Sequence, residues 1–319
     1  MERHPAARVG HGRTWAKAIL IGEHSVVYGH ASVVLPLRDL EMRATVTPID
    51  GPSTLHSLDY EGPLSQAGPR FACVARAFEA ARELTGGLDQ SFAIQTVSDF
   101  PHERGMGSSA ASAGAIIRAV LDAFGREASE AELLALTNLA EQVAHVRPSG
   151  LDAAATISDV PIRFQSGEIR SLSQHVDGTL VIADSGVHGS TRDAVAGLRG
   201  RYEADPDTVG PRINRLGELT QDAIDALDAG DTAALGAAMD GAHRVLRELG
   251  ISIPVLDDLT SAARDAGALG AKLTGGGLGG CVIALAASDT EAENIRAALL
   301  AAGAAQTWTY QMRTSEALQ

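Results

Sequence analysis

The stretch PHERGMGSSAASAGAII, residues 101–117, places glycines and two serines directly before an alanine-rich helical pattern. The first turn of a helix leaves backbone N–H groups without partners and carries about half a positive charge, so a glycine-lined approach to it favours an anion. The hydroxyls of Ser108 and Ser109 add donors or a metal ligand. The stretch predicts a phosphate-binding loop, with simple N-capping by one of these serines as the alternative.

A second glycine-rich stretch, TGGGLGG at 274–280, fits the G-x-G-x-x-G spacing of dinucleotide-binding loops. It is followed by the apolar, β-branched run CVIALAA rather than by a helix, and no acidic residue about 20 positions on ends a second strand. We therefore expect a loop between two strands and no nicotinamide or flavin cofactor. Residues 101–117 also lack the P-loop and protein-kinase signatures, so an ATP enzyme of neither class is left open.

Composition excludes several classes of protein. The 319 residues include 40 Asp and Glu against 26 Lys and Arg, a formal charge of −14, which argues against a nucleic-acid partner or an anionic membrane surface. Cys73 and Cys281 are too few and too far apart for a disulfide framework or a zinc site, and they fit a reducing cytoplasm. We expect a cytoplasmic protein without an export signal or a membrane span.

Short strands and helices alternate irregularly along the chain, with direct strand-to-strand joins, which predicts two α+β domains rather than one parallel sheet. The boundary is expected within 165–178, giving domains 1–175 and 176–319. Apolar runs predict strands at 16–23, 31–37, 42–49, 91–97, 270–274, 280–285 and 306–312, and the second half is more helical from residue 179 on. Helical spacing predicts helices at 70–86, 108–125, 129–146 and 289–302, and several between 211 and 265.

Charged residues bracket the apolar strand in AKAILIGEHSVVYG, with Lys17 at its head and Glu23 and His24 at its end. For any one of these alone, an ordinary surface end of a strand is the simpler interpretation. The three residues become candidates for a site only in combination with other motifs.

A third candidate motif is AEQVAHVRPSGLDAAAT, 140–156. The residue before a proline is disfavoured in helical geometry, so the helix that carries Glu141 should end near Arg147 and another should begin after Gly150. Asp152 then lies in or just before a first helical turn, whose dipole keeps a carboxylate ionised and suited to face a substrate hydroxyl. Simple N-capping by Asp152 is equally compatible with the sequence.

Taken in order, KAILIGEHSVVYG (17–29), PHERGMGSSAA (101–111), RPSGLDAA (147–154) and KLTGGGLGGC (272–281) resemble the motifs of the GHMP kinases, the superfamily of galactokinase, homoserine kinase, mevalonate kinase and phosphomevalonate kinase. The resemblance spans about residues 14–310. It is closest to the mevalonate kinase family, through GEHSVVYG at 22–29 and DSGVHGSTRDAVAG at 184–197. It implies a ribosomal protein S5 domain 2-like N-terminal domain, a ferredoxin-like C-terminal domain and an active site in the cleft between them.

The resemblance also implies an activity, ATP-dependent phosphorylation of the C5 hydroxyl of (R)-mevalonate in the isoprenoid pathway, and roles for single residues. Asp152 would take the proton from that hydroxyl or orient it, and Lys17 would stabilise the transferring phosphoryl group. Glu23, His24 and Thr191 would lie near the substrate, and Ser109 and Glu141 would hold Mg²⁺. ATP would be bound by Arg104, Gly105, Met106, Gly107, Ser108, Ser109, Ala110, Ala111, Gly275, Gly276 and Gly277.

Two departures from the family pattern and several alternatives accompany this interpretation. Glu103 stands where many GHMP kinases have glycine, and TWAK at 14–17 replaces the frequent A-P-G-K. The alternatives are a related GHMP kinase that uses phosphomevalonate or another hydroxy acid, a diphosphomevalonate decarboxylase, and a non-catalytic ligand-binding protein. A homodimer is one assembly that the resemblance allows.

Overall fold

The computed structural model describes residues 7–58, 60–102, 104–144 and 150–312. The expectations for Glu103 and Arg147 therefore fall outside the described residues. Contacts divide the chain into two compact units that interleave along the sequence, so the predicted boundary at 175/176 stays a prediction. Unit 1 comprises 1–17, 36–102 and 107–159, and unit 2 comprises 18–35, 103–106 and 160–319.

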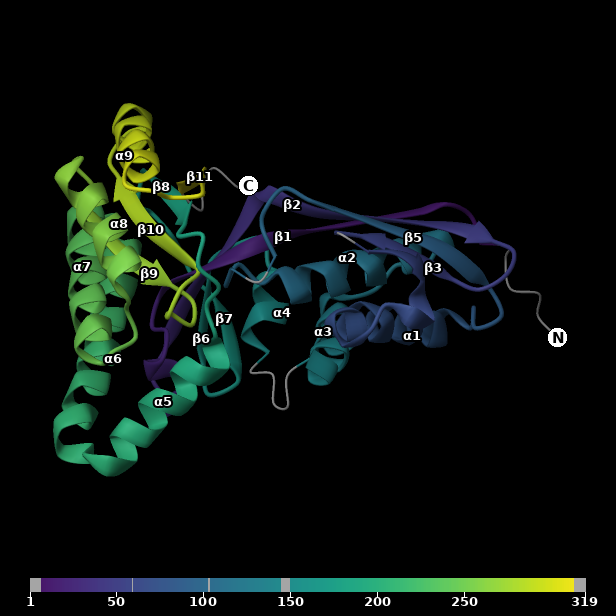
Figure 1. Ribbon diagram of the computed structural model, residues 1–319, viewed down its shortest axis with the longest axis horizontal. Helices are drawn as coiled ribbons and strands as arrows, with labels where there is room; N and C mark the ends of the chain where they lie inside the picture. The colour runs from purple at the N-terminus through teal and green to yellow at the C-terminus, as the bar shows by residue number, and fades with distance from the viewer. Residues whose placement is uncertain (1–6, 59, 103, 145–149, 313–319) are drawn as a thin grey trace. The chain divides into compact units, whose positions relative to one another are not determined.

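Unit 1 packs helices against a mainly antiparallel sheet, with α1, α2 and α3 in mutual contact (Figure 1). Strand β5 pairs antiparallel with β2 and parallel with β3, and β3 pairs with β4. The strands are β1 (Gly10–Ile21), β2 (Ser32–Ile49), β3 (Thr54–Ser57), β4 (Tyr60–Pro63) and β5 (Ser91–Ser98). The helices are α1 (Ala72–Thr85), α2 (Ser108–Ala123), α3 (Glu130–Ala144) and α4 (Leu151–Ala155), with 3-10 turns η2 (Leu64–Gln66) and η3 (Pro69–Phe71).

Unit 2 is built on an antiparallel sheet in the order β11-β8-β10-β9. The first residues of β2 also belong to this unit and pair with β6. The strands are β6 (Ile162–Gln165), β7 (Glu168–Ser171), β8 (Gly178–Asp184), β9 (Gly270–Thr274), β10 (Cys281–Ala286) and β11 (Gln306–Met312). The helices are α5 (Thr191–Ala204), α6 (Pro206–Ala229), α7 (Thr232–Glu248), α8 (Pro254–Asp265) and α9 (Asp289–Ala301), with the 3-10 turn η1 (Ser25–Tyr28).

The structure differs from the predicted elements at several positions. Strand β1 begins at Gly10 rather than at residue 16, and the short strands β3, β4, β6 and β7 were not predicted. The separate strands expected at 31–37 and 42–49 form one strand, β2, because the exposed Arg38 and Asp39 interrupt the apolar pattern but not the extended backbone. Pairing with β5 runs from Met42 to Ile49, the last residue of β2. Cross-strand hydrogen bonds, rather than local hydrophobicity, therefore decide where this strand ends. Helix α5 was not predicted, because its described buried residues are only Ala194 and Leu198, one turn apart.

Small residues explain how β1 lies against the alanine-rich helix α2. A Cβ added at Gly10 would lie 2.1 Å from the carbonyl oxygen of Ala119, and one at Gly12 would lie 2.0 Å from that of Ala115. Nearby, the Thr14 hydroxyl donates a hydrogen bond of 2.7 Å to the Ala111 carbonyl. This close contact places Lys17, three residues farther along β1, near the N-terminus of α2.

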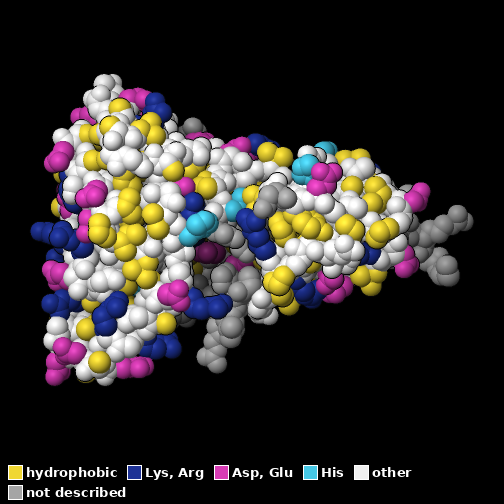
Figure 2. Space-filling model, viewed as in Figure 1, with side chains coloured by type: hydrophobic (Ala, Val, Ile, Leu, Met, Phe, Trp, Pro, Cys, Tyr) yellow, Lys and Arg dark blue, Asp and Glu magenta, His cyan; other side chains and the backbone are white. Residues whose placement is uncertain are grey.

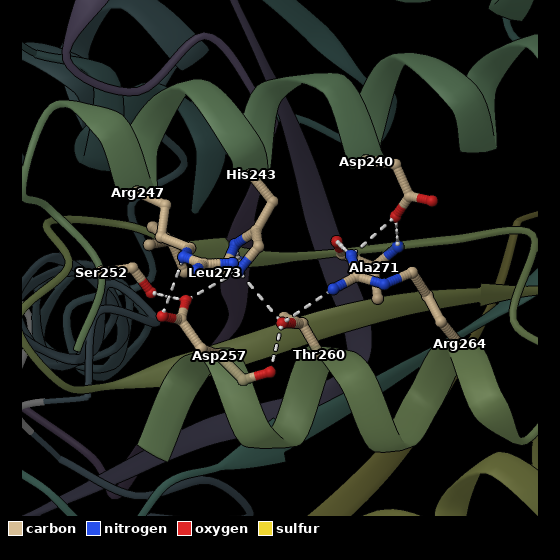
Figure 3. A network of polar contacts seen from close by, with 9 residues as sticks. All are labelled: Asp240, His243, Arg247, Ser252, Asp257, Thr260, Arg264, Ala271 and Leu273. Carbon is tan, nitrogen blue, oxygen red and sulfur yellow. Dashed lines mark hydrogen bonds and ion pairs between the residues drawn. The ribbon is translucent and has the colours of Figure 1, made fainter. Parts of the chain in front are cut away.

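Side chains from α7 cover the outer edge of β9, the last strand in its sheet (Figure 3). The Ala271 N–H donates to Asp240 Oδ1 at 2.8 Å, and the Leu273 N–H donates to His243 Nδ1 at 3.3 Å. An unpaired strand edge invites association with other strands. These two side chains remove that liability and hold the strand that leads into the TGGGLGG loop.

His243 should make the stability of unit 2 sensitive to acid. Burial lowers its pKa to about 4 from an ordinary 6.5, with Asp257 at 3.1 Å opposing the shift. The unfolded chain therefore binds this proton first, and the free energy of unfolding should fall by about 2 kcal/mol between pH 7.5 and pH 5. In urea denaturation at both pH values, His243→Gln should show a smaller loss. An equal loss in the variant would remove His243 as its source.

None of the described helices is both long and apolar enough to cross a membrane. On the face that Figure 2 shows, described Lys and Arg side chains are interspersed with Asp and Glu instead of gathering into one basic patch.

Candidate active site

Lys17 and Asp152 form an ion pair within unit 1. Lys17 Nζ lies 3.1 Å from Asp152 Oδ1; the lysine side chain is 4% exposed and the aspartate side chain 41%. Helix α4 begins after Gly150, whose backbone is left-handed, and no side chain caps it, so Asp152 lies in the first turn without being the N-cap. The alternative in which Asp152 serves only as a helix cap is therefore wrong. Its carboxylate is held by a buried ammonium and still accessible to a substrate.

The glycine-serine loop approaches the same lysine. Gly107 is the N-cap of α2 with φ of 73°, and no side chain caps this helix. The alternative in which Ser108 or Ser109 serves only as a helix cap is wrong for that reason. A Cβ at Gly107 would lie 2.8 Å from Lys17 Cγ, so glycine is what lets the lysine stem lie against the start of α2. Unit 1 thus joins a helix N-terminus, an ammonium and a carboxylate, three groups that suit phosphate chemistry.

Ser109 and Glu141, which the family resemblance implies as neighbours, are in contact. The Ser109 hydroxyl donates a 2.6 Å hydrogen bond to Glu141 Oε1, and Glu141 is buried. The Cys73 thiol lies 3.2 Å from the same oxygen and donates to it. Burial, reinforced by the charge of Glu141, raises the pKa of the Cys73 thiol, so it stays protonated and remains a donor. From the sequence, Cys73 was only excluded from a disulfide framework or a zinc site, and nothing there indicated this contact.

The GEH turn of unit 2 is held by a buried ion pair that the sequence did not reveal. Lys272 of β9 is fully buried, and its ammonium binds Glu23 Oε1 and the Leu273 carbonyl, the latter at 2.6 Å. Burial lowers the pKa of Lys272, and the charge of Glu23 opposes that shift. A signal was present in the composition, because Lys17 and Lys272 are the two lysines among 26 basic residues. Both are buried, and both contact a carboxylate.

His24 follows Glu23 with an unusual backbone, φ 63° and ψ −51°. Its Nε2 lies 2.9 Å from the Gly276 carbonyl, which can only accept, so Nε2 carries the proton. Burial lowers the pKa of His24 to about 4, which makes the ring neutral near pH 7. Its buried Nδ1 has no hydrogen-bond partner among the described residues, so it can accept a hydrogen bond from a ligand hydroxyl.

The TGGGLGG loop joins β9 to β10, so its glycines do not form the strand-to-helix loop of a dinucleotide fold. Protein atoms of unit 2 fill the space that side chains would need. A Cβ at Gly276 would lie 2.4 Å from Thr191 Oγ1, and one at Gly277 would lie 2.4 Å from Ile251 Cγ2. Glycine is therefore required here first for packing against the start of α5 and the residues after α7.

The segment that carries Arg104, Gly105 and Met106 lies against this glycine loop, also within unit 2. A Cβ at Gly275 would lie 3.5 Å from the Gly105 Cα. The guanidinium of Arg104 donates through Nε to Asp184 Oδ2 at 3.1 Å. Asp184 was not among the site residues expected from the sequence. Met106 is buried, as are Ala110 and Ala111 in unit 1. We therefore expect these three residues to contact ATP through backbone atoms and not through their side chains.

The predicted site residues therefore form two sets. In unit 1, Lys17 contacts both Asp152 and Gly107, and Ser109 contacts Glu141. The set in unit 2 comprises Glu23, His24, Thr191 and the two glycine segments at 105 and 275–277. Among the described residues no group of three or more His, Cys, Asp and Glu side chains could hold a metal ion alone.

Known proteins match both parts of the chain. The profile of the GHMP kinases N terminal domain matches residues 72–159, and the profile described as GHMP kinases C terminal matches residues 223–305. A mevalonate kinase of Thermococcus onnurineus is 32% identical over 292 residues, which cover 85% of this chain and 87% of the relative. The chain belongs to the mevalonate kinase family of the GHMP kinases. As a member of that family it is a kinase whose co-substrate is ATP.

Solved structures of mevalonate kinases share the α+β fold of this family member. The L. major mevalonate kinase in complex with R-mevalonate has a TM-score of 0.87 at 24% identity and covers 99% of both chains. The enzyme from Staphylococcus aureus MRSA252 has a TM-score of 0.76 at 28% identity, covering 96% of this chain and 99% of its own. The fold and family expected from the four motifs are thereby confirmed.

Proposed function

We propose that this mevalonate kinase family member transfers the γ-phosphoryl group of ATP to the C5 hydroxyl of (R)-mevalonate, with Asp152 and Lys17 as its catalytic residues. The observation that carries the proposal is their ion pair: a carboxylate with 41% of its side chain exposed contacts an ammonium that is almost completely buried. In such a pair the carboxylate can bind a substrate hydroxyl while the ammonium binds a phosphoryl group next to it.

The chemistry divides between the two partners. Asp152 accepts the proton of the C5 hydroxyl, or orients that hydroxyl, as the new oxygen–phosphorus bond forms and the bond from the γ-phosphorus to ADP breaks. Negative charge is spread over the phosphoryl oxygens in this transition state, and Lys17 is placed to stabilise it. The start of α2 supplies backbone N–H groups for the phosphates of ATP. Positioning and charge neutralisation are the main requirements of phosphoryl transfer.

Ser109 and Glu141 fit a magnesium ion. Mg²⁺ prefers oxygen ligands and is commonly held by one or two carboxylates together with substrate phosphates. The hydroxyl and the carboxylate lie 2.6 Å apart at the first turn of α2, where the phosphates are expected. When bound, the ion neutralises charge on the phosphates of ATP. Cys73 keeps the Glu141 carboxylate oriented through its thiol hydrogen bond.

The charges of the described motif residues favour an acceptor without a phosphate group. Lys17 pairs with Asp152, Lys272 with Glu23 and Arg104 with Asp184. His24 is neutral near pH 7 because its pKa lies at about 4. Each of these motif cations is thus already paired or uncharged within its own unit, which suits a singly charged hydroxy acid better than a phosphorylated one.

A coupled ADP-release assay with purified protein and a panel of acceptors tests the proposal. We expect turnover with mevalonate that requires Mg²⁺ and stops when EDTA removes it. Phosphomevalonate, galactose and homoserine should give much lower kcat/KM values. Faster turnover with phosphomevalonate would overturn the substrate assignment, and no ADP release with any acceptor would support a ligand-binding role instead.

A further inference from the structure

The departure TWAK, where GHMP kinases frequently have A-P-G-K, places a tryptophan two residues before Lys17 on β1. Residues i and i+2 of a strand point to the same side. Trp15 and Lys17 accordingly contact the same short segment, α4 and the residues after it. The indole Nε1 donates to the carbonyl oxygens of Ala155 at 3.2 Å and Ser158 at 3.1 Å. Lys17 contacts Asp152 at the other end of that segment.

A helix of five residues has little stability of its own. The last carbonyl groups of a helix need partners from outside it, and Ala155 is completely buried, so water cannot easily replace the indole. Trp15 therefore supplies a partner at the C-terminal end of α4, while Lys17 contacts its first turn. The two contacts together fix where the Asp152 carboxylate lies relative to β1.

The indole is itself held in place. The guanidinium carbon of Arg38 lies 5.1 Å from the centre of the Trp15 ring, a distance typical of a cation–π contact. Arg38 also forms an ion pair of 3.4 Å with Asp159, one residue beyond the second carbonyl that Trp15 binds. Arg38 and Trp15 thus bind the same short stretch of chain after α4 from two directions.

We propose that Trp15 is a positioning residue of this kinase, acting on the reaction through Asp152, with Arg38 as its support. The inference rests on the proposed function of Asp152. It assigns a role to a residue that differs from the family pattern. A purely structural tryptophan would stabilise unit 1 without setting the catalytic rate.

Trp15→Phe keeps an aromatic, though smaller, side chain and removes the N–H donor, which makes it the main test. We expect kcat to fall about tenfold, the size that loss of one buried hydrogen bond produces. KM for ATP should stay within about twofold, because the hydrogen bonds of the indole go to Ala155 and Ser158 and not to the start of α2. Trp308→Phe on β11, in the other unit, is the matched control and should keep the kcat of the natural protein.

A double-mutant cycle separates positioning from stability. If Trp15 acts through Asp152, Trp15→Phe should cause no further loss of kcat in an Asp152→Asn background. The same tenfold loss in both backgrounds, or a lowered Tm with unchanged kcat, would overturn the proposal. Should Trp15→Phe fail to fold, Arg38→Met offers a milder change at a partly exposed residue and should lower kcat in the same direction.

Amide hydrogen exchange gives a readout that does not depend on turnover. The N–H groups of Thr156 and Ser158 bond to the carbonyls of Asp152 and Ala154, and Trp15→Phe should raise their exchange rates. Unchanged exchange in residues 152–158 would contradict the positioning role whatever the substrate proves to be. Absence of turnover in the natural protein would contradict the proposed function alone.

Discussion

Replacing Asp152 with Asn should lower kcat on mevalonate by about two to four orders of magnitude, the range expected when a positioned proton acceptor is removed. The amide keeps the size of the carboxylate but loses its charge and its basicity. It also leaves the buried ammonium of Lys17 without its ionic partner at 3.1 Å. Steady-state ADP release, with nucleotide affinity measured separately by calorimetry, should show a large loss of kcat and nearly unchanged ATP binding.

Asp207→Asn is the matched control for this substitution. Asp207 occupies the second helical position of α6, as Asp152 does in α4, and it is exposed. Any general effect of removing a negative charge from a first helical turn should therefore appear in both variants. We expect the Asp207 variant to retain full activity. A kcat of the Asp152 variant close to that of the natural protein would remove Asp152 from its catalytic role.

Replacing Lys272 with Met should lower the free energy of unfolding by about 3 to 5 kcal/mol, because it removes the ammonium that the buried Glu23 carboxylate contacts. Breaking a buried pair costs more than the pair contributes, since one charge then stays in a low-dielectric environment. The GEH turn should also lose its place on β9, so kcat/KM for mevalonate should fall in the fraction that stays folded. Urea denaturation and the coupled assay measure the two effects.

The pairing itself is tested by removing both charges. Glu23→Gln combined with Lys272→Met should recover most of the lost stability, since both charges of this buried pair are then removed. Arg212→Met, which breaks the partly exposed pair of Arg212 with Glu248 in the same unit, should cost no more than about 1 kcal/mol. Equal losses from Lys272→Met and Arg212→Met would show that burial does not give the Lys272 pair its importance.

The positions of site residues along the chain were predictable because local rules decide them. Ser129 and Glu132 have the S-x-x-E spacing of a capping box and form one at the start of α3, with the Ser129 N–H donating to Glu132 Oε2 at 3.0 Å. The proline after Arg147 and the glycine before Leu151 predicted a new helix start, and Asp152 lies in its first turn. Motif order then identified the family, since four stretches in one sequence are far more specific than one glycine loop.

The contacts of Lys272 and Trp15 could not be predicted in the same way. Lys272 lies in a five-residue buried strand, where the pattern GAKLT gives no partner for the charge. Glu23, its partner, is 249 positions away. Trp15 and the carbonyls that it binds are separated by 140 and 143 positions. Propensity and periodicity act over one or two turns, so such pairs depend on the folded chain.

The sequence by itself determined which residues are available for chemistry and which local backbone each adopts: glycines in left-handed turns, a helix start before Asp152, and strand on both sides of TGGGLGG. These features follow from torsional preferences and hydrogen bonds within a few residues. Only the tertiary structure decided which charged side chains form ion pairs. It also showed that glycine is needed at 276 and 277 because Thr191 and Ile251 pack against these positions. Close packing and the cost of an unpaired buried charge act between distant segments, and the order of residues does not specify those neighbours.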